Sequence, residues 1–346
     1  MTDKNYFIIQ NGTQLLNAIE YAEHNKLRPS DNLLIIVSTT DIIYHDLNIV
    51  ISESEHFNEV RRIFPKFILQ INRHRLGRIL SIIYARNKIA SIARNNINNL
   101  IIGNYQNMFC RLFVKKSISN KIIVVDDGPA TIDIFNSSRR KLSRFNNFIE
   151  KILNIKEYGI QPDVIFTRFS KQLKEKLGKK GAEVQIIDNN FVFLKKDIDN
   201  KEKSLDKLFV GYPFVEEAIF SINEYVDLLN SIKKKVGDFI YVPHRRESQE
   251  SLNYLSKYFQ VKNLGMPFEL YLYKFTVYPG EIIGFFSTVL FNVNQMFGDK
   301  IKLKYIRIEH LEIVHVKNLK NLYDEIDQIA ELVLSIDYEK KDKFYS

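Results

Sequence analysis

Short runs of β-branched and other apolar residues alternate with amphipathic segments along the first half of the chain. These runs lie at residues 6–9, 33–37, 67–71, 100–102, 122–125, 164–167 and 184–187. Strands separated by helical patterns form βαβ units, in which the strands of one sheet run parallel. The sequence therefore predicts an α/β fold with a Rossmann-like first domain.

Two asparagine loops follow strands of this first domain. Asn11 and Gly12 come directly after the run at 6–9 and before a helical pattern that contains Asn17, and Asn104 follows the run at 100–102. The amino end of a helix binds anionic or polar groups well. We expect Asn11, Gly12, Asn17 and Asn104 to contact the substrate on this side.

A second α/β domain is predicted after a polar, charged segment at residues 195–206. With 346 residues the chain exceeds what one hydrophobic core usually supports. We expect a first domain at 1–194, a linker at 195–206, a second domain at 207–318 and a terminal segment at 319–346 that packs back across the domains. The second domain is predicted to hold strands at 208–210, 239–242, 260–261, 282–286 and 302–308, with helices through 225–232 and 319–336.

An acidic motif follows the strand at 122–125. Asp126 and Asp127 stand before Gly128, and successive side chains of a strand point to opposite faces, so we expect only one of the two to meet the substrate. A carboxylate at that place can deprotonate a hydroxyl. The alternative is an ordinary turn or helix-cap sequence.

A histidine motif and a hydroxyl motif follow two strands of the second domain. Pro243, His244 and Arg245 come after 239–242, where a cationic patch would suit a phosphate. Ser287 and Thr288 come after 282–286, where a helix amino end would also bind phosphate, unless Ser287 only caps the helix.

One further acid lies between these two motifs. Glu269 follows Met266-Pro267-Phe268 and is placed either to accept hydrogen bonds from a ribose diol or to stabilise a first helical turn. Because the carboxyl ends of parallel strands meet at one edge of a sheet, widely separated motifs can form a single site.

Taken in this order, the motifs resemble those of the bacterial sialyltransferases and polysialyltransferases of GT-B fold. Those families share an acidic-acidic-Gly motif, a His-Pro motif and a Ser-Ser or Ser-Thr motif, with an acid near a Pro-Phe-Glu sequence between the last two. The segment from Gln10 to Ala18 is also similar to their first strand, loop and helix. The resemblance implies two Rossmann-like domains that face a central cleft.

The resemblance also implies a role for each motif. Asp126 would be the general base on the acceptor hydroxyl, with Asp127 as second choice. The motif of Pro243, His244 and Arg245 would contact the phosphate of a cytidine monophosphate (CMP) leaving group. Ser287 and Thr288 would hold the same phosphate, and Glu269 would hold the ribose. The implied reaction is an inverting transfer of a nonulosonic acid from its CMP-linked donor to a bacterial surface glycan, either a capsule or a lipooligosaccharide.

The sequence departs from the family pattern at two positions. Proline precedes His244 where the families place it after the histidine, and Tyr212 stands in a loop where a smaller polar residue is expected. The sugar therefore stays open among sialic, pseudaminic and legionaminic acids. A GT-B transferase of nucleotide-diphosphate sugars and a non-enzymatic, anion-binding envelope assembly protein are the alternatives.

No cofactor is expected beyond the activated sugar. The seven histidines lack metal-ligand spacing, and the single cysteine, Cys110, cannot form a metal-binding pair. Asp126 and Asp127 could hold Mg²⁺, but acids separated by one residue are the more usual pattern for metal-dependent transfer. We therefore expect a metal-independent enzyme.

The charge balance favours anionic partners. There are 50 Lys and Arg residues against 41 Asp and Glu residues, a net charge of +9. No nucleic-acid motif accompanies the charge, so we expect no nucleic-acid partner. One cysteine, no signal peptide and no apolar run of about 18 residues predict a cytoplasmic protein, with peripheral contact at the inner membrane face. Acceptor, linkage, repeated transfer and oligomeric state stay open.

Overall fold

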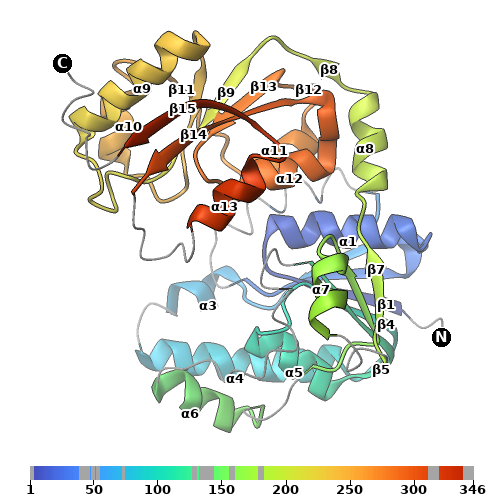
Figure 1. The fold of residues 1–346 in the computed structure, drawn as a ribbon. Coiled ribbons are helices and arrows are strands. Elements are labelled where there is room, and N and C mark those ends of the chain that lie inside the picture. The colour runs from blue at the N-terminus through green and yellow to red at the C-terminus, as the bar shows by residue number, and fades with distance from the viewer. Residues whose placement is uncertain are drawn as a thin grey trace. The chain divides into compact units, whose positions relative to one another are not determined.

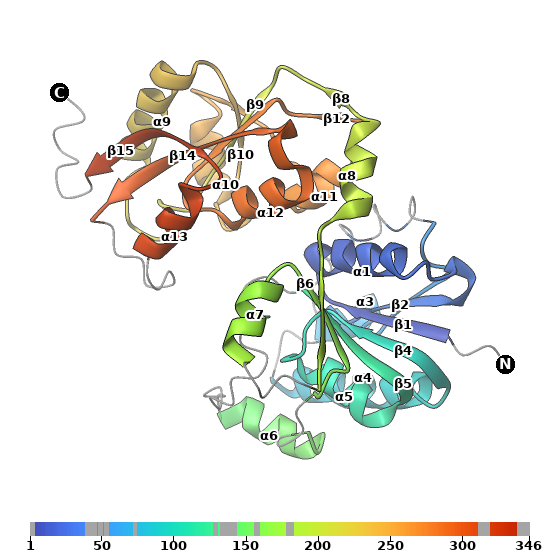
Figure 2. The ribbon, with the colours of Figure 1, turned by 45° about the vertical axis from the view of Figure 1, so that its right-hand side comes forward.

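The computed structural model describes residues 4–38, 47, 51, 55–71, 75–126, 131, 144–155, 160–177, 183–310 and 319–337. The chain forms two compact units, Met1–Phe193 and Leu194–Ser346. Each unit is built around a parallel sheet with helices packed against it (Figure 1, Figure 2).

The described strands of the first unit form a seven-stranded parallel sheet in the order β3-β2-β1-β4-β5-β6-β7. The strands are β1 (Lys4–Ile9), β2 (Asn32–Ile36), β3 (Glu59–Arg62), β4 (Asn96–Ile102), β5 (Ile118–Val125), β6 (Val164–Thr167) and β7 (Gln185–Asp188). The helices are α1 (Gly12–His24), α3 (Lys66–Ile71), α4 (Arg75–Ile92), α5 (Met108–Lys116), α6 (Arg144–Ile152) and α7 (Ser170–Leu177), with a 3-10 turn at Pro29–Asp31.

The central strands are apolar on both faces because helices cover both faces of the sheet. Consecutive residues Phe7, Ile8 and Ile9 of β1 are completely buried. Figure 2 shows α1 on one face of the sheet and α4 and α5 on the other. A continuous apolar run is what a parallel strand buried on both sides requires.

One predicted strand of this unit is wrong. Residues 67–71 belong to helix α3 (Lys66–Ile71), and the strand of that region is β3 (Glu59–Arg62). A short apolar run does not distinguish a strand from a helix, and Pro65 directly before α3 favours a helix start. All four β3 residues are only partly buried, because β3 is an edge strand that pairs only with β2 among the described strands.

The described strands of the second unit form a six-stranded parallel sheet in the order β11-β10-β9-β13-β14-β15. These strands are β9 (Lys207–Val210), β10 (Ile240–Val242), β11 (Gln260–Val261), β13 (Glu281–Gly284), β14 (Lys302–Glu309) and β15 (Glu331–Asp337). The helices are α8 (Val192–Asp199), which begins at the end of the first unit, α9 (Ile222–Val236), α10 (Gln249–Leu255), α11 (Phe268–Lys274), α12 (Thr288–Phe297) and α13 (Leu319–Ile326). Strands β8 (Glu202–Lys203) and β12 (Val277–Tyr278) form a separate pair, and Gly298–Lys300 is a 3-10 turn.

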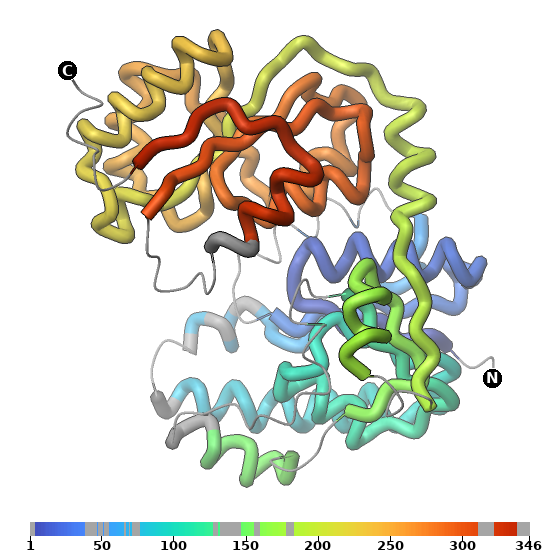
Figure 3. The backbone as a smooth tube through the Cα atoms, viewed as in Figure 1, coloured from blue at the N-terminus to red at the C-terminus, as the bar shows by residue number. Residues whose placement is uncertain are grey.

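Two predicted features of this unit differ from the structure. The expected helix at 319–336 ends at Ile326, and Glu331–Asp337 forms strand β15 beside β14 (Figure 3). Pairing with β14 satisfies the backbone of this segment, and that tertiary interaction overrides a helical spacing of apolar residues. The segment 195–206, predicted as an irregular linker, contains most of α8 and all of β8.

The strand order determines which loops are neighbours at the carboxyl edge of each sheet. In the second unit the order reverses at β9, which lies between β10 and β13. The loop after β9 is therefore placed between the loop that carries His244 and the loop that carries Ser287. Ligands of open α/β sheets bind at such a reversal point.

Candidate active site

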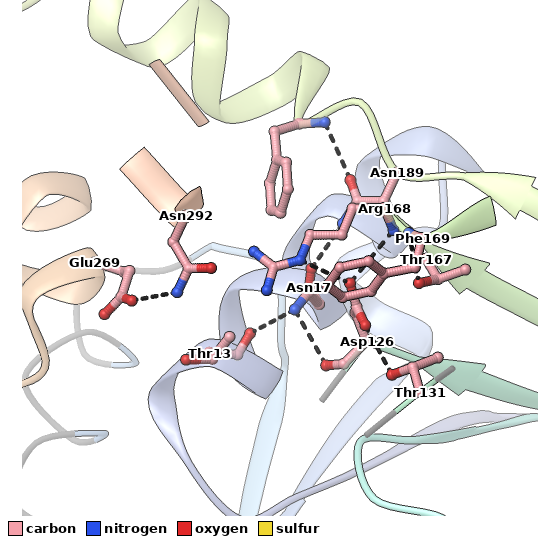
Figure 4. Close-up of polar contacts among 11 residues, drawn as sticks. Thr13, Asn17, Asp126, Thr131, Thr167, Arg168, Phe169, Asn189, Glu269 and Asn292 are labelled. Carbon is pink, nitrogen blue, oxygen red and sulfur yellow. Dashed lines mark hydrogen bonds and ion pairs between the residues drawn. The ribbon is translucent and has the colours of Figure 1, made fainter. Parts of the chain in front are cut away.

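Asp126 lies at the carboxyl end of β5 and is almost completely buried. Its Oδ1 accepts a hydrogen bond from the hydroxyl of Thr131 at 2.7 Å, and its Oδ2 accepts one from the backbone N–H of Arg168 at 3.3 Å. The guanidinium Nε of Arg168 lies 3.4 Å from the same Oδ2 (Figure 4). This carboxylate is fixed from both sides and paired with a buried cation.

Burial and pairing act in opposite directions on the acidity of Asp126. Burial raises the pKa of its carboxyl, and the charge of Arg168 and the hydrogen bond from Thr131 lower it in part, so the pKa stays above its ordinary value. A carboxylate with a raised pKa is a stronger base toward a hydroxyl. The environment suits the proton-accepting role predicted for Asp126.

We predict that Arg168→Met moves the acid limb of the pH–rate profile upward. The substitution removes the charge that lowers the pKa of Asp126 but leaves its burial, so the pKa of this carboxyl rises further. Activity should then fall at a higher pH, because in its predicted role as base Asp126 must be ionised. Initial rates measured across pH would show the shift.

A matched control exists in the same unit. Arg111 pairs with the buried Glu150 at 3.0 Å, so Arg111→Met also breaks a buried ion pair. Both variants should lose stability, by roughly 3 kcal/mol for a broken buried pair. Only Arg168→Met should move the acid limb, and an unmoved limb in that variant would contradict the assignment of Asp126 as base.

Asn17, predicted to contact substrate, is bonded within the protein. Its side-chain amide donates to the backbone oxygen of Asp126 at 3.2 Å and to that of Thr13 at 3.0 Å (Figure 4). Its carbonyl oxygen accepts from the amide of Asn189 at 2.7 Å. Asn17 is buried and ties α1 to the strand ends that carry Asp126 and Asn189, and its contact with substrate stays a prediction.

The other predicted residues of the first unit lie at two neighbouring strand ends. Asn11 caps α1 by accepting from the backbone N–H of Gln14 at 2.9 Å, and Gly12 is the first residue of that helix and buried. Asn104 stabilises its own turn by accepting from the backbone N–H groups of Gln106 and Asn107. Contact with an acceptor stays a prediction for all of them. Asp127 lies outside the described residues.

In the second unit, His244 is a neutral hydrogen-bonding group. Burial, with the charges of Arg246 and Arg245, lowers the pKa of its ring to about 4. Its Nδ1 accepts the backbone N–H of Arg246 at 3.2 Å, which leaves the ring proton on Nε2. At neutral pH the low pKa favours the uncharged ring in the free protein, and contact of His244 with a phosphate stays a prediction. The cations of this loop are the exposed Arg245 and Arg246, and Pro243 connects the loop to β10.

Tyr212 connects the histidine motif to the hydroxyl motif. Its ring centroid lies 6.1 Å from that of His244 and 4.8 Å from that of Phe286, the residue before Ser287. Its hydroxyl donates to Glu217 at 3.1 Å, and Glu217 also pairs with Arg246 at 2.6 Å. The tyrosine that departs from the family pattern therefore fills the space between the two motifs.

Ser287 and Thr288 begin helix α12. Ser287 is the N-cap residue, and its hydroxyl accepts the backbone N–H of Val289 at 3.2 Å. Thr288 is exposed at the first position of the helix. Ser287 therefore caps the helix, and phosphate contact by Ser287, Thr288 and the helix amino end stays a prediction.

Glu269 lies in the first turn of α11 and is buried. Its carboxylate accepts a hydrogen bond from the amide of Asn292 in α12 (Figure 4). This bond links Glu269, the residue predicted to bind the ribose, to helix α12, which Ser287 caps. Binding of the ribose stays a prediction.

The described residues contain no group of three or more His, Cys, Asp or Glu that could hold a metal ion. Cys110 is buried in α5. In the described part of the chain, no helix is both long and apolar enough to span a membrane.

A pocket of about 760 Å³ opens in the second unit beside the amino ends of α9 and α10. None of the predicted site residues lines it, since its walls are Val215, Glu216, Ile222, Ser248, Gln249, Glu250, Ser251, Asn253, Tyr254 and Lys257.

Three partners of the site were not predicted from the sequence. Thr131 and Arg168 contact Asp126 from positions 5 and 42 residues further along the chain, and Glu247 holds the loop of His244. Arg168 comes directly after the predicted strand 164–167, so its place at a strand end was a signal that could have identified it.

Two solved structures share this architecture. UGT89C1 of Arabidopsis thaliana, in complex with UDP-L-rhamnose, aligns with a TM-score of 0.52 and 12% identity over 99% of this chain and 88% of that chain. A putative UDP-N-acetylglucosamine 2-epimerase of Listeria monocytogenes aligns with a TM-score of 0.51 and 11% identity over 94% of this chain and 88% of that chain. The fold is of the GT-B type, with two Rossmann-like domains, as predicted.

The family follows from the sequence itself. The family model of the alpha-2,8-polysialyltransferases matches residues 5–305, and the chain belongs to this family. It is a glycosyltransferase, which transfers a sugar from a donor to a glycan acceptor. A search of curated proteins finds no match. The predicted relation to polysialyltransferases is confirmed for the family, while the roles of the single motifs stay predictions.

Proposed function

We propose that this enzyme transfers a nonulosonic acid from its CMP-linked donor to a hydroxyl group of a bacterial surface glycan. The donor sugar is sialic acid or a relative such as pseudaminic or legionaminic acid, and the glycan is a capsule or a lipooligosaccharide. The observation that carries the proposal is the family match over residues 5–305.

In the proposed reaction the acceptor oxygen attacks the anomeric carbon of the donor. The bond from that carbon to the phosphate oxygen breaks, CMP leaves, and the acceptor proton passes to Asp126. Attack opposite to the leaving group inverts the anomeric centre. The buried position of Asp126 and its raised pKa support this role.

The leaving phosphate is neutralised by hydrogen bonds and by arginine charge. His244 would donate from Nε2, and the amino end of α12 with Thr288 would donate to the other phosphate oxygens. Arg245 and Arg246 supply positive charge on the same loop. With these donors, we propose that transfer needs no metal ion.

The donor class is tested by nucleotide binding. We expect CMP to raise the melting temperature of the protein more than uridine or guanosine nucleotides do, both with and without Mg²⁺. Preference for a uridine or guanosine diphosphate would instead indicate a transferase of nucleotide-diphosphate sugars. Stabilisation by none of them, with salt-sensitive glycan binding, would indicate an anion-binding assembly protein.

A contact with the inner membrane surface is a further part of the proposal. It rests on the net charge of +9 and on three clusters: Arg73-His74-Arg75 with Arg78, Arg139-Arg140-Lys141 with Arg144, and Lys340-Lys341-Asp342-Lys343. Residues 73–74, 139–141 and 340–343 of these clusters lie outside the described residues. Co-sedimentation with anionic vesicles that weakens at high salt would support it, and absence of binding would contradict it.

A further inference from the structure

A chain of buried hydroxyl groups and one carboxylate lies beneath the loop that carries His244. Glu247 accepts the backbone N–H of His244 at 2.5 Å and the hydroxyl of Tyr241 at 2.8 Å, one with each carboxylate oxygen. Both donors therefore depend on the same side chain. A carboxylate that accepts two such bonds holds the two groups at a fixed separation.

The chain continues from Glu247 to the neighbouring loop. The hydroxyls of Tyr241 and Tyr225 lie 2.9 Å apart, and the hydroxyl of Tyr225 accepts the backbone N–H of Tyr212 at 3.4 Å. Both of these tyrosines are buried, with at most 1% of their surface exposed. The network therefore connects the loop after β10 to the loop after β9, and Tyr212 in turn contacts His244.

The space around the network is filled. A Cβ atom added to Gly211 would lie 2.1 Å from the hydroxyl oxygen of Tyr241 and 2.7 Å from Oε1 of Glu247. Only a residue without a side chain fits there without moving the tyrosine or the carboxylate. The backbone after β9 thus packs directly against the group that holds His244.

We propose that Glu247 is a positioning residue of the donor site. It holds the loop of His244 so that the Nε2–H of His244 faces the donor phosphate. The proposal rests on the proposed function, because it takes His244 as the phosphate contact. It assigns to Glu247 no contact with substrate. Its action passes through the backbone of His244 and through Tyr241.

The titration of Glu247 changes the stability of the fold with pH, and this change can be measured separately from CMP binding. Burial raises the pKa of its carboxyl to about 7, while the bonds from His244 and Tyr241 lower it and the nearby charge of Glu216 raises it. A pKa that is higher in the folded state stabilises the fold at low pH, and this stability is lost as pH rises from about 4.5 to about 7. Tyr241 and Tyr225 also face Glu247, and both stay neutral throughout this range because burial raises their pKa values.

The test compares Glu247→Gln and Glu247→Ala with Glu250→Gln, a control that removes a carboxylate exposed in the first turn of α10. The titration of His244 by NMR, the CMP affinity by calorimetry and the urea stability across pH are measured for each. We expect CMP affinity to fall about tenfold in Glu247→Ala and less in Glu247→Gln, whose carbonyl oxygen can still accept one bond. The pKa of His244 should move from about 4 toward 6.5 in both variants of Glu247, as its loop loosens.

The loss of stability between about pH 4.5 and pH 7 should be smaller in Glu247→Gln than in the wild-type protein and unchanged in Glu250→Gln. If Glu247→Ala does not fold, Tyr241→Phe, which removes one donor to the same carboxylate, takes its place. The positioning role would be overturned if folded variants of Glu247 bound CMP with the wild-type affinity and the pKa of His244 in them stayed as in the wild-type protein. Failure of the wild-type protein to bind CMP would reject the proposed function instead, and the His244 titration would still test whether Glu247 holds the loop.

Discussion

Asp126→Asn is expected to lower the turnover rate by about a thousandfold, since the loss of a general base typically costs 10²–10⁴-fold. The asparagine keeps the size of the side chain and can accept the bond from the Thr131 hydroxyl at 2.7 Å, but it cannot take up the acceptor proton. CMP affinity should stay unchanged, because Asp126 belongs to the first unit and the predicted nucleotide contacts belong to the second. Rates with a CMP-linked nonulosonic acid and calorimetry with CMP measure both quantities.

Asp127→Asn is the matched control for this experiment. The two residues are adjacent in sequence, and the substitution is the same. Turnover that survives in both variants would contradict the assignment of the base to this motif, and loss in Asp127→Asn alone would transfer the role to Asp127. Melting temperatures show whether either variant loses activity by unfolding.

The pH dependence of the wild-type enzyme gives the same residue a second test. Because burial raises the pKa of Asp126, its ionised form is lost on acidification at a higher pH than for an exposed aspartate. Turnover should fall through that range, and the folded state should be favoured there, since protonation removes a buried charge. An acid limb at the pKa of an ordinary aspartate would contradict the buried environment.

Much of the fold could be predicted because parallel strands have a local signature. Strands β1, β2 and β6 are apolar on both faces, and such runs are visible in sequence without knowledge of their neighbours. The edge strand β3 carries two arginines and a glutamate and has no such run. Its strand conformation depends on pairing with β2, which sequence spacing does not show.

The positions of the motifs at strand ends could be predicted from the sequence, and the contacts around them could not. Asp126, His244 and Ser287 follow strands, so their places at the sheet edges follow from the strand pattern. The properties of two of them depend on tertiary contacts instead. Arg168 contacts Asp126 across 42 residues of sequence, and the pKa of His244 is set by its burial and by the two arginines that follow it. The same arginines suggested a cationic histidine from the sequence, whereas their charge disfavours its protonation.

His244→Ala is expected to lower kcat/KM by about a hundredfold or more, the loss seen when one donor to a developing negative charge is removed. In the free protein the low pKa favours a neutral ring with its proton on Nε2, so in the proposed role His244 would donate a hydrogen bond and add no positive charge. CMP affinity should fall, while the affinity for cytidine, which has no phosphate, should stay as it is. His244→Gln, whose amide can donate a bond from a similar position, should retain part of the affinity. His310→Ala is the control in the same unit, because His310 is exposed and bonded to Asp337. Equal losses of CMP and cytidine binding would show that His244 supports the loop rather than the phosphate.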